Sequence, residues 1–204
     1  MLNMIQGAVV PDRALLSEGY EVIRAIRGLM AIDANVGADK FLPLFTTFLH
    51  AHRNEPVFFI LEVPCNQEEE RQARGDEACP MHKNIYYMDG LDEEAALSIL
   101  REKGELLIHD GLSSFGFGGH ISQDEMMKSK YNVCNVFTKN IPAACKIFEA
   151  HGIPRTDHLV TAWETFTLEH PGSCTAHMVN GESIYDLVPY FVERGMYLAE
   201  RRED

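Results

Sequence analysis

Two histidines and an aspartate lie close together in the middle of the chain. His109 and Asp110 are adjacent, His120 follows them, and Asp124 and Glu125 come soon afterwards. An imidazole beside a carboxylate can act as a general base with an orienting partner, and such a set can also bind a divalent metal. The spacing matches no established ligand pattern such as H-E-x-x-H. We therefore keep a small hydrolase or metal-assisted enzyme that uses His109, Asp110 and His120 as an alternative function.

A second group of potential ligands precedes this segment. Cys65, Cys79 and His82 resemble half of a zinc site in spacing. A structural zinc ion needs four ligands, and the other three cysteines stand alone in the sequence. Zinc binding by this group is therefore a weak alternative, and we expect no cofactor. The chain has five cysteines, and this odd number favours a reducing compartment over a disulfide framework.

Neither the serines nor the glycines form an established catalytic motif. Ser113 and Ser114 do not fit the strand-to-helix elbow of G-x-S-x-G. Four glycines are close together, but no Lys-Ser/Thr pair follows them as in a phosphate-binding loop. These glycines are Gly111, Gly116, Gly118 and Gly119. We expect Gly116 to relieve crowding between Phe115 and Phe117, which we place in the core, and Gly118-Gly119 to make a turn.

The charge balance is strongly acidic. The chain contains 18 Lys plus Arg against 31 Asp plus Glu, and its formal net charge is -13. Such a surface repels phosphate backbones and anionic lipid headgroups, so we expect no nucleic-acid and no membrane partner. It attracts a basic protein at long range. The leading hypothesis is a non-enzymatic acidic protein-binding module, for example an immunity-type inhibitor of a basic bacterial toxin or nuclease.

Two runs of carboxylates are the expected contact surfaces for such a partner. The first run lies in a polar segment at 65–83, which we interpret as a long surface loop, and the second lies in an acidic turn. The proposed contact residues are Glu68, Glu69, Glu70, Asp76, Glu77, Asp89, Asp92, Glu93 and Glu94. A regulatory interaction module with an apolar groove is a third hypothesis, which an exposed hydrophobic patch would favour.

The length and composition are those of a folded domain. A chain of 204 residues can bury a sizeable core, and we expect one domain spanning 1–204. The first twelve residues lack a basic region, and no run is apolar enough for a membrane span. We expect a cytoplasmic protein.

The apolar spacing predicts helices at the start of the chain. Residues 17–30 and 39–52 have apolar positions three and four residues apart. The run at 56–63 predicts a strand that is buried on both faces, and the chain returns to the core at 85–88. A further helix is expected at 157–169, with Trp163 in the core.

Later segments predict strand-helix units and turns. The segments 84–104 and 132–152 each combine a short strand, a turn, a helix and a terminal glycine. Asp110-Gly111 and Asn180-Gly181 are typical hairpin turns. A last helix is expected from about Pro189 to the end of the chain. Together these predict an α+β fold with a mixed or mostly antiparallel sheet, hairpins, an N-terminal helical pair and helices packed on the sheet.

Overall fold

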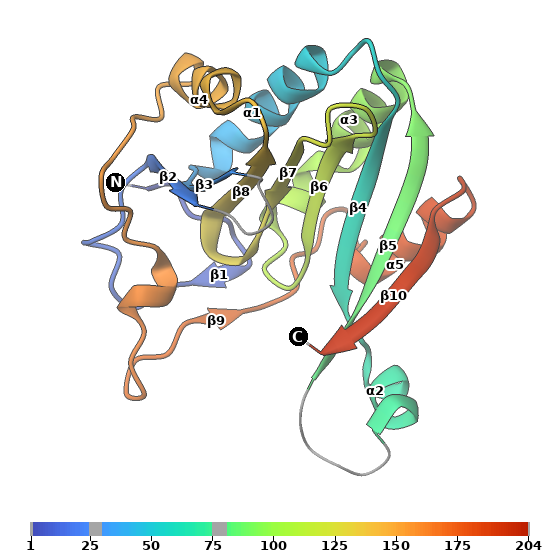
Figure 1. Cartoon of the computed structure of the whole chain (residues 1–204). Helices are drawn as coiled ribbons and strands as arrows, with labels where there is room; N and C mark the ends of the chain where they lie inside the picture. Colours follow the sequence, from blue (N-terminus) through green and yellow to red (C-terminus); the bar gives the residue numbers. More distant parts are fainter. Residues whose placement is uncertain (1, 25–29, 75–80, 204) are drawn as a thin grey trace.

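An eight-stranded antiparallel sheet is the centre of the fold (Figure 1). The computed structural model describes residues 2–24, 30–74 and 81–203. The strand order is β10-β5-β4-β6-β7-β8-β3-β2. The strands are β2 (Gly19–Arg24), β3 (Met30–Asn35), β4 (Val57–Pro64), β5 (His82–Leu91), β6 (Ser114–Gly119), β7 (Glu125–Lys128), β8 (Val133–Thr138) and β10 (Tyr197–Glu203).

Five α-helices and a small second sheet complete the described fold. The helices are α1 (Ala38–Ala51), α2 (Gln67–Arg74), α3 (Glu93–His109), α4 (Ile141–Ala150) and α5 (Ile184–Val192). Short 3-10 helices are η2 (Lys130–Asn132) and η3 (Ala162–Thr165), and the small sheet pairs β1 (Ala8–Val9) with β9 (Ser173–Cys174). The expected α+β class with a single domain is confirmed.

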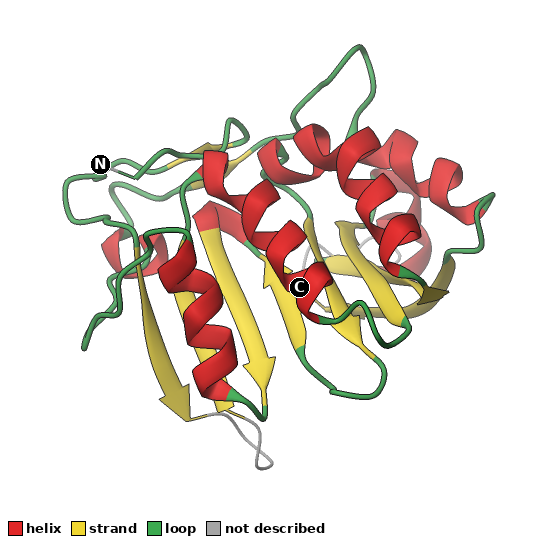
Figure 2. Ribbon diagram, turned by 90° about the horizontal axis from the view of Figure 1, so that it is seen from above, coloured by secondary structure: helices red, strands yellow, loops and turns green. Residues whose placement is uncertain are grey.

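Helices α1, α3, α4 and α5 cover one face of the sheet (Figure 2). Aromatic side chains fill the space between the layers. The Phe45 ring of α1 lies 4.9 Å from the Phe115 ring of β6, and the Phe191 ring of α5 lies 5.2 Å from the Phe59 ring of β4. Aromatic pairs at such distances add to the stabilisation from burial alone. The core therefore lies on this side of the sheet.

The expected N-terminal helical pair is half wrong. The second helix is present as α1, but the segment expected as the first forms strand β2, whose residues pair with β3 from Gly19 to Arg24. Tyr20 is fully buried, and its main chain pairs with Ala34 of β3. β-branched Val22 and Ile23 suit this conformation. The rest of the expected helix includes residues 25–29, which lie outside the described part of the chain.

The expected hairpin at Asp110-Gly111 is also wrong. The apolar run before it forms the last turns of α3, and Asp110 is the C-terminal capping residue of that helix. Gly111 allows the backbone of Gly7 to approach closely, because a Cβ atom at position 111 would lie 1.8 Å from the main-chain oxygen of Gly7. The turn expected at Asn180-Gly181 is present. Both residues have positive φ, and an antiparallel β-bridge joins Val179 to Glu182.

Three further expectations need correction. The last helix, α5, begins at Ile184 after a Ser183–Asp186 capping box, and the chain end that we expected to be helical is strand β10. The segment 157–169 contains only the short helix η3. The loop expected at 65–83 contains helix α2. The two strand-helix units are present as β5-α3 and β8-α4.

Candidate functional site

The opposite face of the sheet carries no helix among the described residues and forms the near side in Figure 1. Side chains directly opposite one another on neighbouring strands share a face. One such row runs through Phe58 of β4, Gly118 of β6, Glu125 of β7 and Phe137 of β8. We call this side of the sheet the helix-free face.

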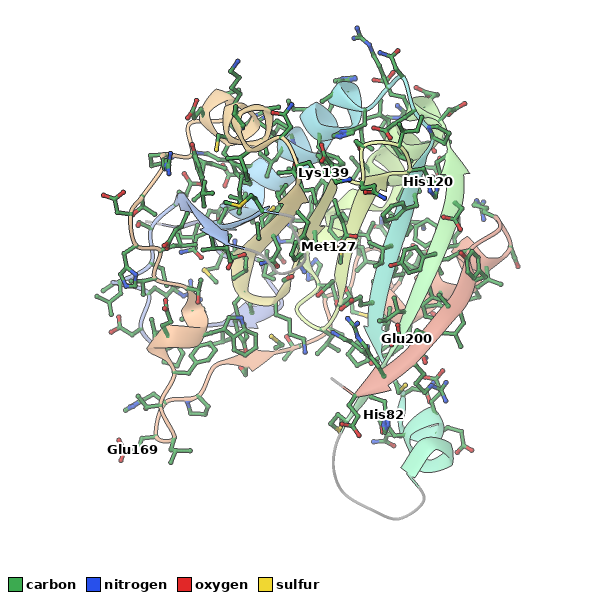
Figure 3. The ribbon with its side chains drawn as sticks, in the orientation of Figure 1. His82, His120, Met127, Lys139, Glu169 and Glu200 are labelled. Carbon is green, nitrogen blue, oxygen red and sulfur yellow. The ribbon has the colours of Figure 1, made fainter. Side chains whose placement is uncertain are left out.

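An apolar strip occupies the middle of the helix-free face. Ile60, Ile85 and Met127 are buried together, and Phe58 and Tyr87 pack against them. Met127 lies near the centre of this side in Figure 3. The strip explains the apolar run from Val57 to Leu61 in β4, since one side of that strand faces the helices and the other faces the strip.

Glycines on β6 make room for the strip. A Cβ atom at Gly116 would lie 2.3 Å from Met127 Sδ, and one at Gly118 would lie 2.3 Å from the Phe58 ring. The side chains of Met127 and Phe58 therefore occupy the space over β6 that side chains at Gly116 and Gly118 would fill. Gly116 therefore relieves crowding, although the neighbour it makes room for is Met127. The turn expected at Gly118-Gly119 is wrong, because both residues lie within strand β6 and pair with β4.

Carboxylates surround the apolar strip and have different partners. Glu62 pairs with Lys83 at 2.8 Å and with Arg202 at 3.1 Å. Glu125 has a raised pKa because burial disfavours its charge and the Glu62 carboxylate adds repulsion. Glu200 on edge strand β10 is exposed (Figure 3). The face thus combines apolar area with carboxylates, and the cations Lys83 and Arg202 lie on it beside Glu62.

One end of the helix-free face is hollowed. The hollow has a volume of about 400 Å³ and is lined by Glu62, Pro64, Lys83, Leu112, Ser114, Ser129, Lys130 and Trp163. Trp163 is 53% exposed, so the expectation of a core residue is wrong. Its ring packs at 4.8 Å against Tyr131, which holds the indole at the rim. A half-exposed tryptophan beside a hollow is typical of a contact surface.

The proposed catalytic set does not come together. Asp110 is fully buried, and its carboxylate accepts hydrogen bonds from the Ser113 main chain, the Ser113 hydroxyl and the main-chain N–H of His177. His109 Nδ1 accepts from the main-chain N–H of Gln6 at 3.2 Å. His120 lies beyond the other end of β6, where Nε2 contacts Asp89 at 3.3 Å. Asp110 and His109 hold chain segments together, and His120 belongs to a different end of the molecule.

A fully buried lysine completes the Asp110 cluster. Lys128 Nζ donates to the main-chain oxygens of Asp110 at 2.6 Å and Ser113 at 3.3 Å. Burial lowers the pKa of Lys128 to about 8, although the charge of Asp110 opposes this shift. The cluster joins the end of α3 to β7.

The carboxylates proposed as contact residues separate into two groups. Glu68, Glu69 and Glu70 lie on α2, beside the start of β5, whereas Asp89 and the acidic residues after it lie at the other end of that strand. Ten residues of strand span about 33 Å. The two runs therefore cannot form one patch.

Most of these carboxylates also have partners within the chain. Glu70 is buried and accepts from the main-chain N–H of His82, and Glu69 accepts from Asn84 at 2.8 Å. Asp92 caps α3. The remaining partners are Tyr197 and His120 for Asp89, His50 for Glu93 and Arg101 for Glu94. Asp76 and Glu77 lie outside the described residues.

The half zinc site is tested only in part. Cys79 lies outside the described residues, and His82 Nδ1 contacts a Glu70 oxygen at 3.1 Å. Burial raises the pKa of the Cys65 thiol, whose Sγ donates to Asn84 Oδ1 at 3.4 Å. Within the described ranges, no group of three or more His, Cys, Asp or Glu side chains could hold a metal ion.

The structure contains a second hollow that the sequence analysis did not predict. It has a volume of about 290 Å³ and lies between the end of α1, β8 and α4. His52 lines it, with Nδ1 facing the Phe48 main-chain oxygen at 2.8 Å and Nε2 facing Asp124 at 3.2 Å. His52 therefore connects the end of α1 to Asp124, the residue that precedes β7.

The helix-free face itself had a weak signal in the sequence. Lys83, Ile85 and Tyr87 alternate with residues of the other face, and Gly116 alternates with Phe115 and Phe117. This pattern shows that two faces exist, but not which one the helices cover. The two core phenylalanines of β6 are as expected.

Compared with known proteins, the chain matches no protein-family model and no curated protein. Among the helices that the structure describes, none is long and apolar enough to cross a membrane.

Proposed function

We propose that this protein is a non-enzymatic protein-binding module whose helix-free face engages a basic protein, as an immunity-type inhibitor of a basic bacterial toxin or nuclease would. The observation that carries the proposal is the apolar strip bordered by carboxylates on a sheet face without helices. An apolar centre within a charged border is the usual anatomy of a protein interface.

The net charge supports this partner class. A formal charge of -13 accelerates encounter with a basic protein and disfavours nucleic acid and anionic membranes. Because the two acidic runs lie far apart, we propose the helix-free face as the contact surface in their place. This surface has the carboxylates of the acidic-module hypothesis and the apolar area of the apolar-groove hypothesis.

The cysteines support a cytoplasmic location. Cys65, Cys134, Cys145 and Cys174 are free thiols. Free thiols are typical of proteins in a reducing compartment.

Peptide binding measured by calorimetry tests the proposal. An arginine- and lysine-rich peptide should bind, its glutamate-rich counterpart should not, and affinity should fall steeply between about 0.05 and 0.3 M salt. Glu200→Lys on the helix-free face should weaken binding. Glu193→Lys, a matched exposed substitution beside α5, should have a smaller effect. Salt-insensitive binding, preference for the acidic peptide, or equal loss in both variants would overturn the proposal.

A further inference from the structure

Glu125 differs from the other carboxylates near the apolar strip. Glu62 contacts two cations, and Asp33 accepts a hydrogen bond from Asn135 at 2.8 Å. Within the described part of the chain, the side chain of Glu125 forms no hydrogen bond or ion pair, and the negative charge of Glu62 repels it. A half-buried carboxylate without a cation is costly in the free protein.

The surroundings of Glu125 are aromatic. Gly118 lies directly between Phe58 and Glu125 in the cross-strand row, and Phe137 is the next residue on the other side. Because Gly118 has no side chain, the Phe58 ring lies over β6 in the direction of Glu125. Phe58 also contacts the rings of Tyr87 at 5.6 Å and His120 at 5.4 Å.

We infer that Glu125 is the anchor for one arginine of the basic partner, whose guanidinium pairs with the carboxylate and stacks on Phe58. This inference rests on the proposed function and names the residue that recognises the partner. A planar, weakly hydrated guanidinium can pair with a carboxylate through two parallel hydrogen bonds while its flat face covers an aromatic ring. A lysine ammonium lacks this planar geometry.

Docking of the arginine would also offset the free-energy cost of holding the Glu125 carboxylate half-buried without a cation. A guanidinium replaces water over the carboxylate, and the pair becomes stronger as water is excluded. The pKa of Glu125, which burial and Glu62 raise in the free protein, should fall when the cation arrives. The exposed Glu200, in contrast, has little to gain from the same cation.

The test compares three peptides of the same length, containing arginine, lysine or citrulline at the basic positions, on wild type, Glu125→Gln and Glu200→Gln. The arginine peptide should bind Glu125→Gln about tenfold more weakly than wild type and bind Glu200→Gln within about twofold of wild type. The preference for arginine over lysine should shrink in Glu125→Gln. Carboxyl NMR of wild type should show the titration midpoint of Glu125 falling when the arginine peptide is added.

The outcomes separate this inference from the proposed function. If Glu125→Gln binds the arginine peptide as tightly as wild type, or if the Glu125 resonance is unchanged at saturation, the anchor is wrong and the basic-partner proposal stands. If neither cationic peptide binds wild type better than the citrulline peptide, both fail. Glu125→Gln is close to isosteric, and its unfolding temperature verifies that a loss of binding is not a loss of fold.

Discussion

Lys128 Nζ lies 2.6 Å from the main-chain oxygen of Asp110, and both side chains are fully buried. The Asp110 carboxylate in turn accepts from Ser113 and from the main-chain N–H of His177. One buried pair therefore connects α3, β6, β7 and the segment after β9. Removing a member should be costly because the charge that remains would be buried without compensation.

Lys128→Met should change how stability depends on pH. The folded-state pKa of about 8 lies below the ordinary value of 10.5, so between these values the unfolded chain binds more protons than the folded one. The free energy of unfolding of wild type should therefore gain up to about 1.4 kcal/mol per pH unit in this window relative to Lys128→Met. Urea unfolding from pH 8 to 9.5 measures the difference. Parallel curves for the two proteins would contradict the assignment.

Two buried tyrosines have the opposite effect in more alkaline solution. Burial raises the pKa of Tyr20 and of Tyr131 above the ordinary value of 10. Both groups stabilise the fold below that value and lose this contribution as the pH rises through their folded-state pKa. Stability should therefore decrease again in strongly alkaline solution, with the opposite sign to the effect of Lys128.

Asp110→Asn should destabilise the protein by about 3 kcal/mol, because several donors lose a charged acceptor in a buried site. Asp92→Asn is the matched control: Asp92 Oδ1 caps α3 by accepting from Ala95 N–H at 2.8 Å, and asparagine caps equally well. Chemical unfolding of both variants measures the contrast. Similar stabilities would show that Asp110 is not structural, and would reopen a chemical role for it.

Gly118→Ala should destabilise the fold by about 2 kcal/mol, because its Cβ atom would meet the Phe58 ring at 2.3 Å. Gly104→Ala in α3 should instead be stabilising by about 0.5 to 1 kcal/mol, since the nearest neighbour is Leu42 Cδ1 at an ordinary 3.6 Å and alanine favours helix. Thermal unfolding compares the two. A destabilised Gly104→Ala or a neutral Gly118→Ala would be inconsistent with the packing described.

Trp163 is the single tryptophan of the chain and lines the hollow at the end of the helix-free face. A partner that covers this face should remove water from the indole, and the fluorescence emission should shift to shorter wavelength. A fluorescence titration with the basic peptide measures the shift in emission wavelength. The Trp163→Phe variant gives the background signal without tryptophan. A shift with the glutamate-rich peptide alone would argue against the proposed orientation of charge.

Local patterns in the sequence predicted several elements correctly. The apolar spacing of α1, the β-branched run of β4 and the two strand-helix units all appear in the structure. The errors occurred where one pattern fits two structures: Tyr20, Val22 and Ile23 suit both a helix and a strand, and pairing with β3 decides for the strand. Asp110-Gly111 has the composition of a hairpin turn, but the preceding helix and the approach of Gly7 decide its conformation.

The sequence by itself determined the acidic charge, the α+β class and the identity of the aromatic core residues of β6, because these follow from composition and from short-range periodicity. Only the tertiary structure decided that His109 and His120 lie at opposite ends of β6, and that Phe58, Gly118 and Glu125 form one row. The register between strands distant in sequence fixes these relationships, and a linear pattern of residue types does not contain that register.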